Sequence, residues 1–189
     1  MMAGIGHNSG REAANGWRRF AWRQARTALL PKLPVEVVRL RVRRAQEMGL
    51  PYKTYAGVRA STGHDLIGFL FSSNALRVTR TGDGLPQDRS KRLASLVKTE
   101  RIALAVPPLL PSAFDDVDVV DRSVGAPGFE LSWTQTRDRF RAVFAGLGQS
   151  GDRFIIIGDQ AIERDWVAAA QAAGYVPASE FFSSAVAAR

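Results

Sequence analysis

The chain of 189 residues has no cysteine and only two histidines. The absence of thiols excludes disulfides, thiolate catalysis and cysteine-based zinc sites, and two histidines are too few for a histidine-rich metal site. Apolar runs such as "RIALAVPPLLP" and "RFIIIG" fall far short of the roughly 20 residues that a membrane-spanning helix needs. We therefore expect a protein without a membrane span, whose stability comes from the packing of its side chains.

Several motifs that carry enzyme chemistry are missing as well. The sequence has no G-x-x-x-x-G-K-[ST] phosphate loop, no G-x-G-x-x-G after an apolar run and no G-x-S-x-G turn, and their absence favours a protein that is not an enzyme. The first ten residues, "MMAGIGHNSG", lack the basic start and apolar core of a secretory signal. The expected location is therefore the cytoplasm.

What the chain does contain is the composition of a globular protein, with 46% hydrophobic and 23% charged residues, which is ordinary for a folded domain. Its length predicts one domain, or a small domain with an appendage. The change of composition along the chain predicts a disordered tail over residues 1–14, a basic helical region over 15–99 and a small α/β region over 100–189. The last two regions could also form one compact domain.

Positive charge is concentrated in the first half of the chain. Residues 1–99 hold 18 basic and six acidic residues, whereas residues 100–189 hold eight and twelve. A chain polarised in this way attracts polyanions to one part of its surface. The expected partner is therefore nucleic acid or an acidic protein surface.

Hydrophobic periodicity predicts helices over most of the first half. We expect them at residues 16–30, 34–48 and 52–60, in "HDLIGFLFSSNAL" and from Asp88 onward. In the second half, the runs "RIALAVPP", "DVDVVD" and "RFIIIGD" have the length of buried strands, and the helical segments "SWTQTRDRFRAVFAGLG" and "QAIERDWVAAAQAAGY" follow the last two of them. This alternation is typical of parallel sheets. The predicted fold class is α/β, with a basic helical N-terminal part followed by a small, mostly parallel three-stranded sheet with crossover helices.

The bend between the second and third expected helices contains the spacing of a helix-turn-helix motif. Ala45 and Gly49 lie four residues apart and Leu50 follows, as in helix-turn-helix proteins. The stretch "GLPYKTYA", with its small residue Ala56, also resembles the second helix of phage-repressor-type DNA readers. The next segment, "TGHDLIGFLFSS", has almost no side chains suited to base edges. We therefore interpret the bend as a helix-turn-helix-like corner between two packed helices.

Contact between arginine-rich helices and phosphates is the main functional hypothesis, because such contacts need no sequence reading. It describes a nucleic-acid-associated or regulatory binding protein. The side chains expected to make these contacts are Arg18, Arg19, Arg23, Arg26, Arg39, Arg41, Arg43, Arg44, Lys53 and Arg59. The first expected helix offers an alternative, a protein–protein adaptor that docks through Trp17, Phe20 and Trp22.

A further alternative is enzymatic. Asp121 follows "VDVV" and Asp159 follows "IIIG", so both would end parallel strands at the edge where α/β proteins gather catalytic groups. With the nearby carboxylates of Asp115, Asp116 and Asp118, they could hold Mg²⁺ for the hydrolysis of a phosphoester. Aspartate is also a common helix cap, so the same residues fit a structural role, and the favoured interpretation has no catalytic residue, metal or cofactor.

Overall fold

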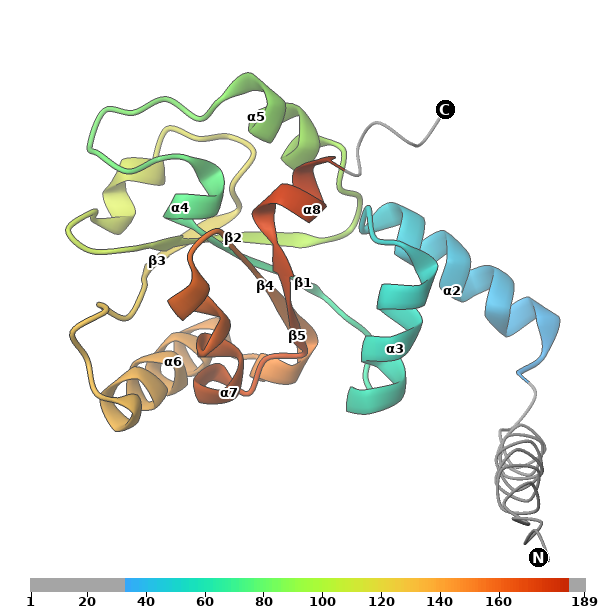
Figure 1. Cartoon of the computed structure of the whole chain (residues 1–189). Helices are drawn as coiled ribbons and strands as arrows, with labels where there is room; N and C mark the ends of the chain where they lie inside the picture. The colour runs from blue at the N-terminus through green and yellow to red at the C-terminus, as the bar shows by residue number, and fades with distance from the viewer. Residues whose placement is uncertain (1–32, 184–189) are drawn as a thin grey trace, which may run out of the picture. The chain divides into compact units, whose positions relative to one another are not determined.

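The computed structural model describes residues 33–183, and the chain divides into two units, residues 1–39 and 40–189. The second unit contains a sheet with helices on both faces (Figure 1). Within the described residues, the longest apolar helix still falls short of what would be needed to cross a membrane.

The sheet has five strands, all parallel, in the order β3-β2-β1-β4-β5. The strands are β1 (Gly68–Ser72), β2 (Glu100–Ala105), β3 (Arg122–Gly125), β4 (Phe154–Gly158) and β5 (Gly174–Pro177). The chain builds the sheet outward from β1, first to β2 and β3 on one side, then to β4 and β5 on the other. This is a doubly wound arrangement, and its switch point lies between β1 and β4.

The central strand β1 is buried on both faces, because it pairs with β2 and β4 and helices cover it above and below. Side chains alternate between the two faces of a strand. Accordingly, Phe69 and Phe71 belong to one apolar cluster and Leu70 to the other. Such strands are continuously hydrophobic in sequence rather than alternating.

Helices cover the sheet on both sides (Figure 1). One face carries Leu76, Leu93 and Phe181 in its cluster, and the other carries Phe140 and Trp166. The helices are α2 (Val35–Glu47), α3 (Tyr52–Thr62), α4 (Ser73–Leu76), α5 (Gln87–Ala94), α6 (Trp133–Leu147), α7 (Trp166–Ala170) and α8 (Ala178–Ser183), with short 3₁₀ helices η1 (Pro111–Phe114), η2 (Gly151–Arg153) and η3 (Ala161–Arg164).

Helices α5 and α8 are joined by arginines stacked on aromatic rings. The guanidinium carbon of Arg89 lies 3.8 Å from the ring centroid of Phe182, and that of Arg92 lies 4.7 Å from Phe181. Burial lowers the pKa of both guanidinium groups. These two cations therefore take part in packing rather than in the exposed basic surface.

The structure confirms the mixed α/β class and the parallel sheet, but the sheet has five strands and not three. The helices expected at 34–48 and 52–60 are confirmed as α2 and α3. Between them, Gly49 adopts a φ of +62° and Leu50 is buried. The corner is thus followed by α3, and a loop and β1 come after that helix, so "TGHDLIGFLFSS" provides no further helix between the end of α3 and Ser73.

Two predicted elements are wrong. The expected helix in "HDLIGFLFSSNAL" is mostly strand β1, because a short apolar run of a doubly buried strand has no periodicity that separates it from a buried helix. The expected strand "DVDVVD" is a loop whose Val117, Val119 and Val120 pack against the core, and β3 begins only at Arg122. The alanine-rich segment near the C-terminus is also divided, into η3, α7 and β5.

Candidate functional site

The two carboxylates of the predicted magnesium site lie at opposite edges of the sheet. Asp121 precedes β3 and accepts hydrogen bonds from Arg101 Nη2 (2.6 Å), Nε (3.0 Å) and backbone N–H (2.8 Å). These hydrogen bonds hold the pKa of Asp121 below its usual range. Asp159 follows the carboxyl end of β4. Because the strands are parallel, the two positions do not meet, and the prediction that Asp121 ends a strand is wrong.

Acidic and histidine side chains are dispersed elsewhere too. Over residues 33–183, no group of three or more histidine, aspartate or glutamate side chains is placed to hold a metal ion. The structure therefore offers no assembled carboxylate cluster to which the magnesium alternative could be assigned.

The carboxyl edge at the switch point is organised around Glu163, whose side chain is fully buried. Its carboxylate accepts hydrogen bonds from Ser72 Oγ (3.0 Å), Asn74 Nδ2 (2.8 Å) and the backbone N–H groups of Asp159 (2.7 Å) and Gln160 (3.0 Å). Ser72 ends β1, Asn74 lies in α4 directly after it, and the last two donors follow β4. Three of these donors share Oε2, and Asn74 binds Oε1. Because its side chain is fully buried and hydrogen-bonded to both segments, Glu163 joins the ends of the central strands and has a structural role.

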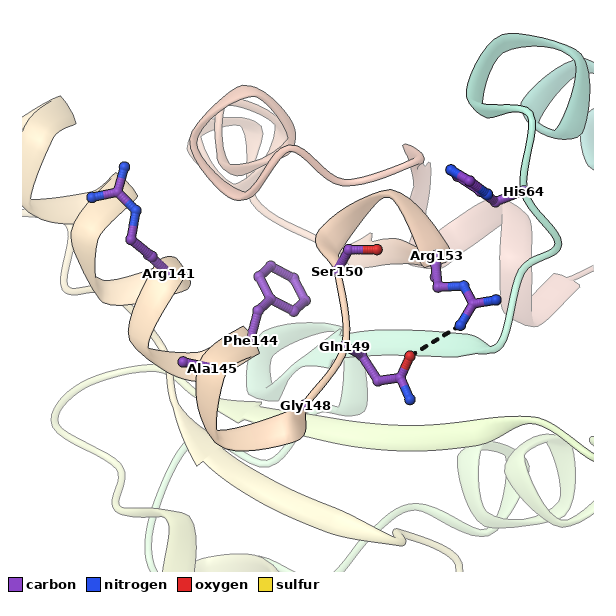
Figure 2. A pocket seen from close by; sticks show the side chains of 8 residues that line it. All are labelled: His64, Arg141, Phe144, Ala145, Gly148, Gln149, Ser150 and Arg153. Carbon is purple, nitrogen blue, oxygen red and sulfur yellow. Dashed lines mark hydrogen bonds between the residues drawn. The ribbon is translucent and has the colours of Figure 1, made fainter.

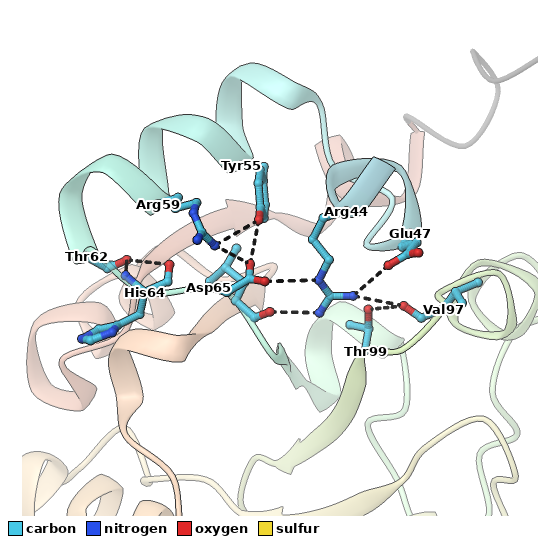
Figure 3. A network of polar contacts seen from close by, with 10 residues as sticks. Arg44, Glu47, Tyr55, Arg59, Thr62, His64, Asp65, Val97 and Thr99 are labelled. Atoms are coloured by element: carbon cyan, nitrogen blue, oxygen red, sulfur yellow. Dashed lines mark hydrogen bonds and ion pairs between the residues drawn. The ribbon is translucent and has the colours of Figure 1, made fainter. Parts of the chain in front are cut away.

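Arg44, one of the predicted phosphate contacts, lies in a polar network (Figure 3). Its Nη2 donates to the carbonyl of Leu66 (3.0 Å), its Nη1 lies 3.3 Å from Glu47 Oε2, and its Nε lies 3.8 Å from Asp65 Oδ2. Only 18% of the side chain is exposed. These contacts give Arg44 a structural role, because they join the end of α2 to the residues that lead into β1.

Arg59 belongs to the same network (Figure 3). Its Nη1 lies 3.2 Å from Asp65 Oδ1, and the Tyr55 hydroxyl donates to the same oxygen at 2.7 Å. Burial raises the pKa of the Tyr55 hydroxyl, and the hydrogen bond to Asp65 raises it further. One carboxylate thus holds two arginines and a tyrosine.

The other predicted basic residues differ in their surroundings. Arg39 pairs with Glu36 at 2.7 Å, and both side chains are exposed. Nε of Arg41 is buried, with no hydrogen-bond partner among the described residues. Arg43 and Lys53 are exposed. The remaining predicted contacts and the adaptor residues lie outside the described residues: Arg18, Arg19, Arg23, Arg26, Trp17, Phe20 and Trp22.

An open cavity of about 620 Å³, which we call the basic basin, lies at the amino edge of the sheet (Figure 2). His64 comes from the segment before β1, Arg153 from the residue before β4, and Arg141 from α6. The full lining is His64, Arg141, Phe144, Ala145, Gly148, Gln149, Ser150 and Arg153, so in the described part of the chain no acidic side chain lines the basin. Asp152 lies outside this lining, with its Oδ2 at 3.5 Å from His64 Nε2.

The two arginines of the basic basin have few partners. Arg153 Nη1 donates to the neutral amide oxygen of Gln149 at 3.1 Å. Arg141 Nη1 lies 3.0 Å from Asp138 Oδ1, and 70% of the arginine side chain is exposed. An exposed ion pair of this kind contributes little stability and exchanges readily. Both guanidinium groups can therefore offer donors to a ligand.

The exposed side of α6 extends the positive charge away from the basin. Trp133, Arg137 and Arg141 are spaced four residues apart, which places them on one side of the helix, and we call them the α6 face. The guanidinium of Arg137 lies 5.3 Å from the Trp133 ring centroid. Asp138 contacts both arginines, at 3.4 Å from Arg137 and 3.0 Å from Arg141. The α6 face thus combines an aromatic ring with two cations, and one acid contacts both cations.

Sequence reasoning missed these residues for two different reasons. The spacing of the α6 face is visible in "SWTQTRDRFR", but it lies in the half of the chain with net negative charge. His64 and Arg153 are far apart in the sequence, and they meet only because β1 and β4 are neighbours in the sheet. Only the strand order could have brought them together.

The fold and these sites define a class: a doubly wound, parallel α/β protein with a structural carboxylate at the carboxyl edge of its sheet and a basic basin at the amino edge. Comparison of the chain with protein-family models, curated proteins and solved structures finds no match. Support for a function therefore comes from the geometry of the basic basin and the α6 face.

Proposed function

We propose that this protein binds nucleic acid, with phosphates lying in the basic basin and along the α6 face. The observation that carries the proposal is the convergence of Arg141, Arg153 and His64 from three separate segments on one cavity that no described acidic side chain lines. Guanidinium groups bind phosphate oxygens through charge-assisted hydrogen bonds. Contacts of this kind supply affinity without reading sequence.

The position of the basic basin favours an extended anion over a small phosphorylated metabolite. Doubly wound sheets bind small ligands at the carboxyl edge of their strands, and here the ends of the two central strands carry a fully buried carboxylate, Glu163, whose hydrogen bonds join the two strand ends. The basin lies at the opposite edge and is open, and its charge continues along the α6 face. A chain of phosphates can contact both places at once.

The charge of the whole chain supports the same partner. The formal net charge of +8 attracts polyanions over longer distances than any single contact. Because Arg44 and Arg59 are held by acids in the Figure 3 network, the proposal assigns the short-range contacts mainly to the basic basin and the α6 face. Arg43 and Lys53, which are exposed, can add to them.

The test is a titration of labelled single-stranded DNA and RNA oligonucleotides, followed by fluorescence anisotropy at low salt. We expect binding, and we expect the double variant Arg141→Ala, Arg153→Ala to lose affinity by roughly tenfold or more, because two charge-assisted hydrogen bonds to phosphate are removed. The matched control is Arg80→Ala, Lys91→Ala. It removes the same charge from the region of α5, where both side chains are exposed.

Two results would contradict the proposal. If the wild-type protein shows no binding at low salt, the protein does not bind nucleic acid. If both double variants lose affinity equally, attraction is diffuse and the basin is not the site. A competition with polyglutamate tests the alternative of an acidic protein partner. If polyglutamate displaces the labelled oligonucleotide as effectively as an unlabelled oligonucleotide does, the partner is an acidic protein instead.

A further inference from the structure

An aromatic cleft of about 170 Å³ lies at the first turn of α6, away from the basic basin. Three of its large apolar residues are exposed to an unusual degree: Phe129 by 43%, Trp133 by 56% and Ile162 by 45%. The lining consists of Gly128, Phe129, Leu131, Trp133, Thr136, Ile162, Asp165, Trp166 and Ala169. Exposed apolar groups that are contiguous, rather than scattered, indicate a binding surface.

The backbone that carries Trp133 and the ring of Trp166 are both held by neighbouring residues. Trp133 is the first residue of α6, directly after a capping box in which Ser132 Oγ accepts from the Gln135 N–H and Gln135 Oε1 accepts from the Ser132 N–H. Trp166 is buried, and its ring centroid lies 6.1 Å from that of Phe129. A ligand that enters the cleft thus meets the packed Trp166 ring, and it meets Trp133 at the ordered first turn of a helix, which reduces the conformational freedom lost on binding.

The size and polarity of the aromatic cleft limit the ligand class. At about 30 Å³ per water molecule, the volume corresponds to roughly six waters, which is enough for one ring system and too small for a drug-sized ligand. The side chains of the lining that can accept hydrogen bonds are the carboxylate of Asp165 and the hydroxyl of Thr136, whereas the indole N–H groups of Trp133 and Trp166 only donate. A carboxylate is an acceptor, so the cleft suits a planar ring whose edge carries N–H donors.

The α6 face connects the aromatic cleft to the basic basin. Trp133 lines the cleft and Arg141 lines the basin, and Arg137 lies between them on the same side of the helix. At 1.5 Å per residue, Trp133 and Arg141 are separated by about 12 Å along the helix axis, with Arg137 about 6 Å from each. A short single strand can span that distance with a base at one end and phosphates along the rest.

We propose that the aromatic cleft binds an unpaired base of single-stranded nucleic acid, stacked on Trp133, while the adjoining phosphates lie on Arg137 and Arg141. This inference rests on the proposed function and adds that the bound nucleic acid is single-stranded. Stacking on aromatic side chains next to a positively charged track is the general mode of single-strand binding. A duplex keeps its bases stacked inside, so it cannot fill the cleft without flipping a nucleotide.

The experiment compares three ligands of equal length: a single-stranded oligonucleotide, its duplex, and an abasic phosphodiester strand. The variant Trp133→Ala is expected to weaken single-strand binding roughly 5- to 150-fold, the range found for loss of one stacked base. Trp133→Phe keeps a stacking surface and is expected to retain most of the affinity. Binding of the abasic strand should be unchanged by either variant. The control Leu110→Ala removes a side chain that is 65% exposed and lies outside the cleft.

The outcomes separate this inference from the proposed function. If Trp133→Ala binds the single strand as tightly as the wild type while Arg141→Ala, Arg153→Ala is impaired, the base site is refuted and nucleic-acid binding stands. The base site is refuted in the same way if the wild type binds the duplex and the abasic strand as tightly as the single strand. If no nucleic acid binds the wild type, both proposals fail together. Melting curves of each variant show whether an affinity loss reflects loss of folding.

Discussion

Gly68 begins β1 at a point where the neighbouring strand leaves no room for a side chain. A Cβ atom at this position would clash with the carbonyl oxygen of Glu100 in β2. The oxygen belongs to the backbone of a paired strand, so it cannot move without disturbing the sheet. The central pair of strands therefore requires glycine here.

We predict that Gly68→Ala destabilises the protein by about 2 kcal/mol or more, because the added methyl group forces β1 and β2 apart. The control is Gly57→Ala in α3, where a Cβ meets nothing within 4 Å; it should raise stability by roughly 0.5–1 kcal/mol, since alanine favours helix over glycine. Urea denaturation measures both. Equal stability of the two variants would show that β2 does not approach β1 as closely as the structure indicates.

At the scale of elements, Glu163 joins the end of β1 and the start of α4 to the loop that follows β4. Removing its side chain leaves the Ser72 hydroxyl, the Asn74 amide and two backbone N–H groups without an acceptor. Buried donors that lose their partner cost considerably more than the net gain of an ordinary hydrogen bond. The switch point of the sheet is therefore expected to depend on this one carboxylate.

We predict that Glu163→Ala lowers the free energy of unfolding by about 3 kcal/mol or more, and that Glu163→Gln has a clearly smaller effect. The amide oxygen of Gln can still accept from Ser72 and the backbone N–H groups, and Asn74 can rotate its amide so that its oxygen faces the new NH₂ group. Chemical denaturation measures the difference, with the exposed Glu130→Ala as a control. If both Glu163 variants match Glu130→Ala, the carboxylate does not hold these two segments together.

Elements with a long or periodic pattern could be predicted from sequence, and short ones could not. The stripe of Phe140, Val143 and Phe144 indicates α6, and the run "FIIIG" indicates β4. Strand β1 resembles a helix in sequence because both its faces are buried, which removes the alternation that identifies a strand. The valines of "DVDVV" suggest a strand, but they pack against the core from a loop. The sequence of a short segment does not show whether other elements of the fold cover one of its faces, both or neither.

At the scale of the whole molecule, the division of charge along the sequence does not coincide with a division of the fold. The change near residue 99 falls between β1 and β2, which are hydrogen-bonded neighbours in one sheet. The first half of the sequence is rich in arginine, but two of these residues, Arg44 and Arg59, form ion pairs with Asp65, which lies after α3. The basic basin instead combines residues from three segments, and the strand order brings them together. A site of this kind follows from topology and not from composition.

The salt dependence of single-strand binding tests the central claim most directly. For a single strand, the plot of log K against log[salt] falls by about 0.7 for each phosphate that the protein neutralises. If Arg141 and Arg153 each contact a phosphate, their replacement by alanine should reduce the slope by about 1.4, while Arg80→Ala, Lys91→Ala leaves the slope near that of the wild type. A wild-type slope in the Arg141→Ala, Arg153→Ala protein would mean that no phosphate lies in the basic basin, and the proposed function of the basin would be wrong.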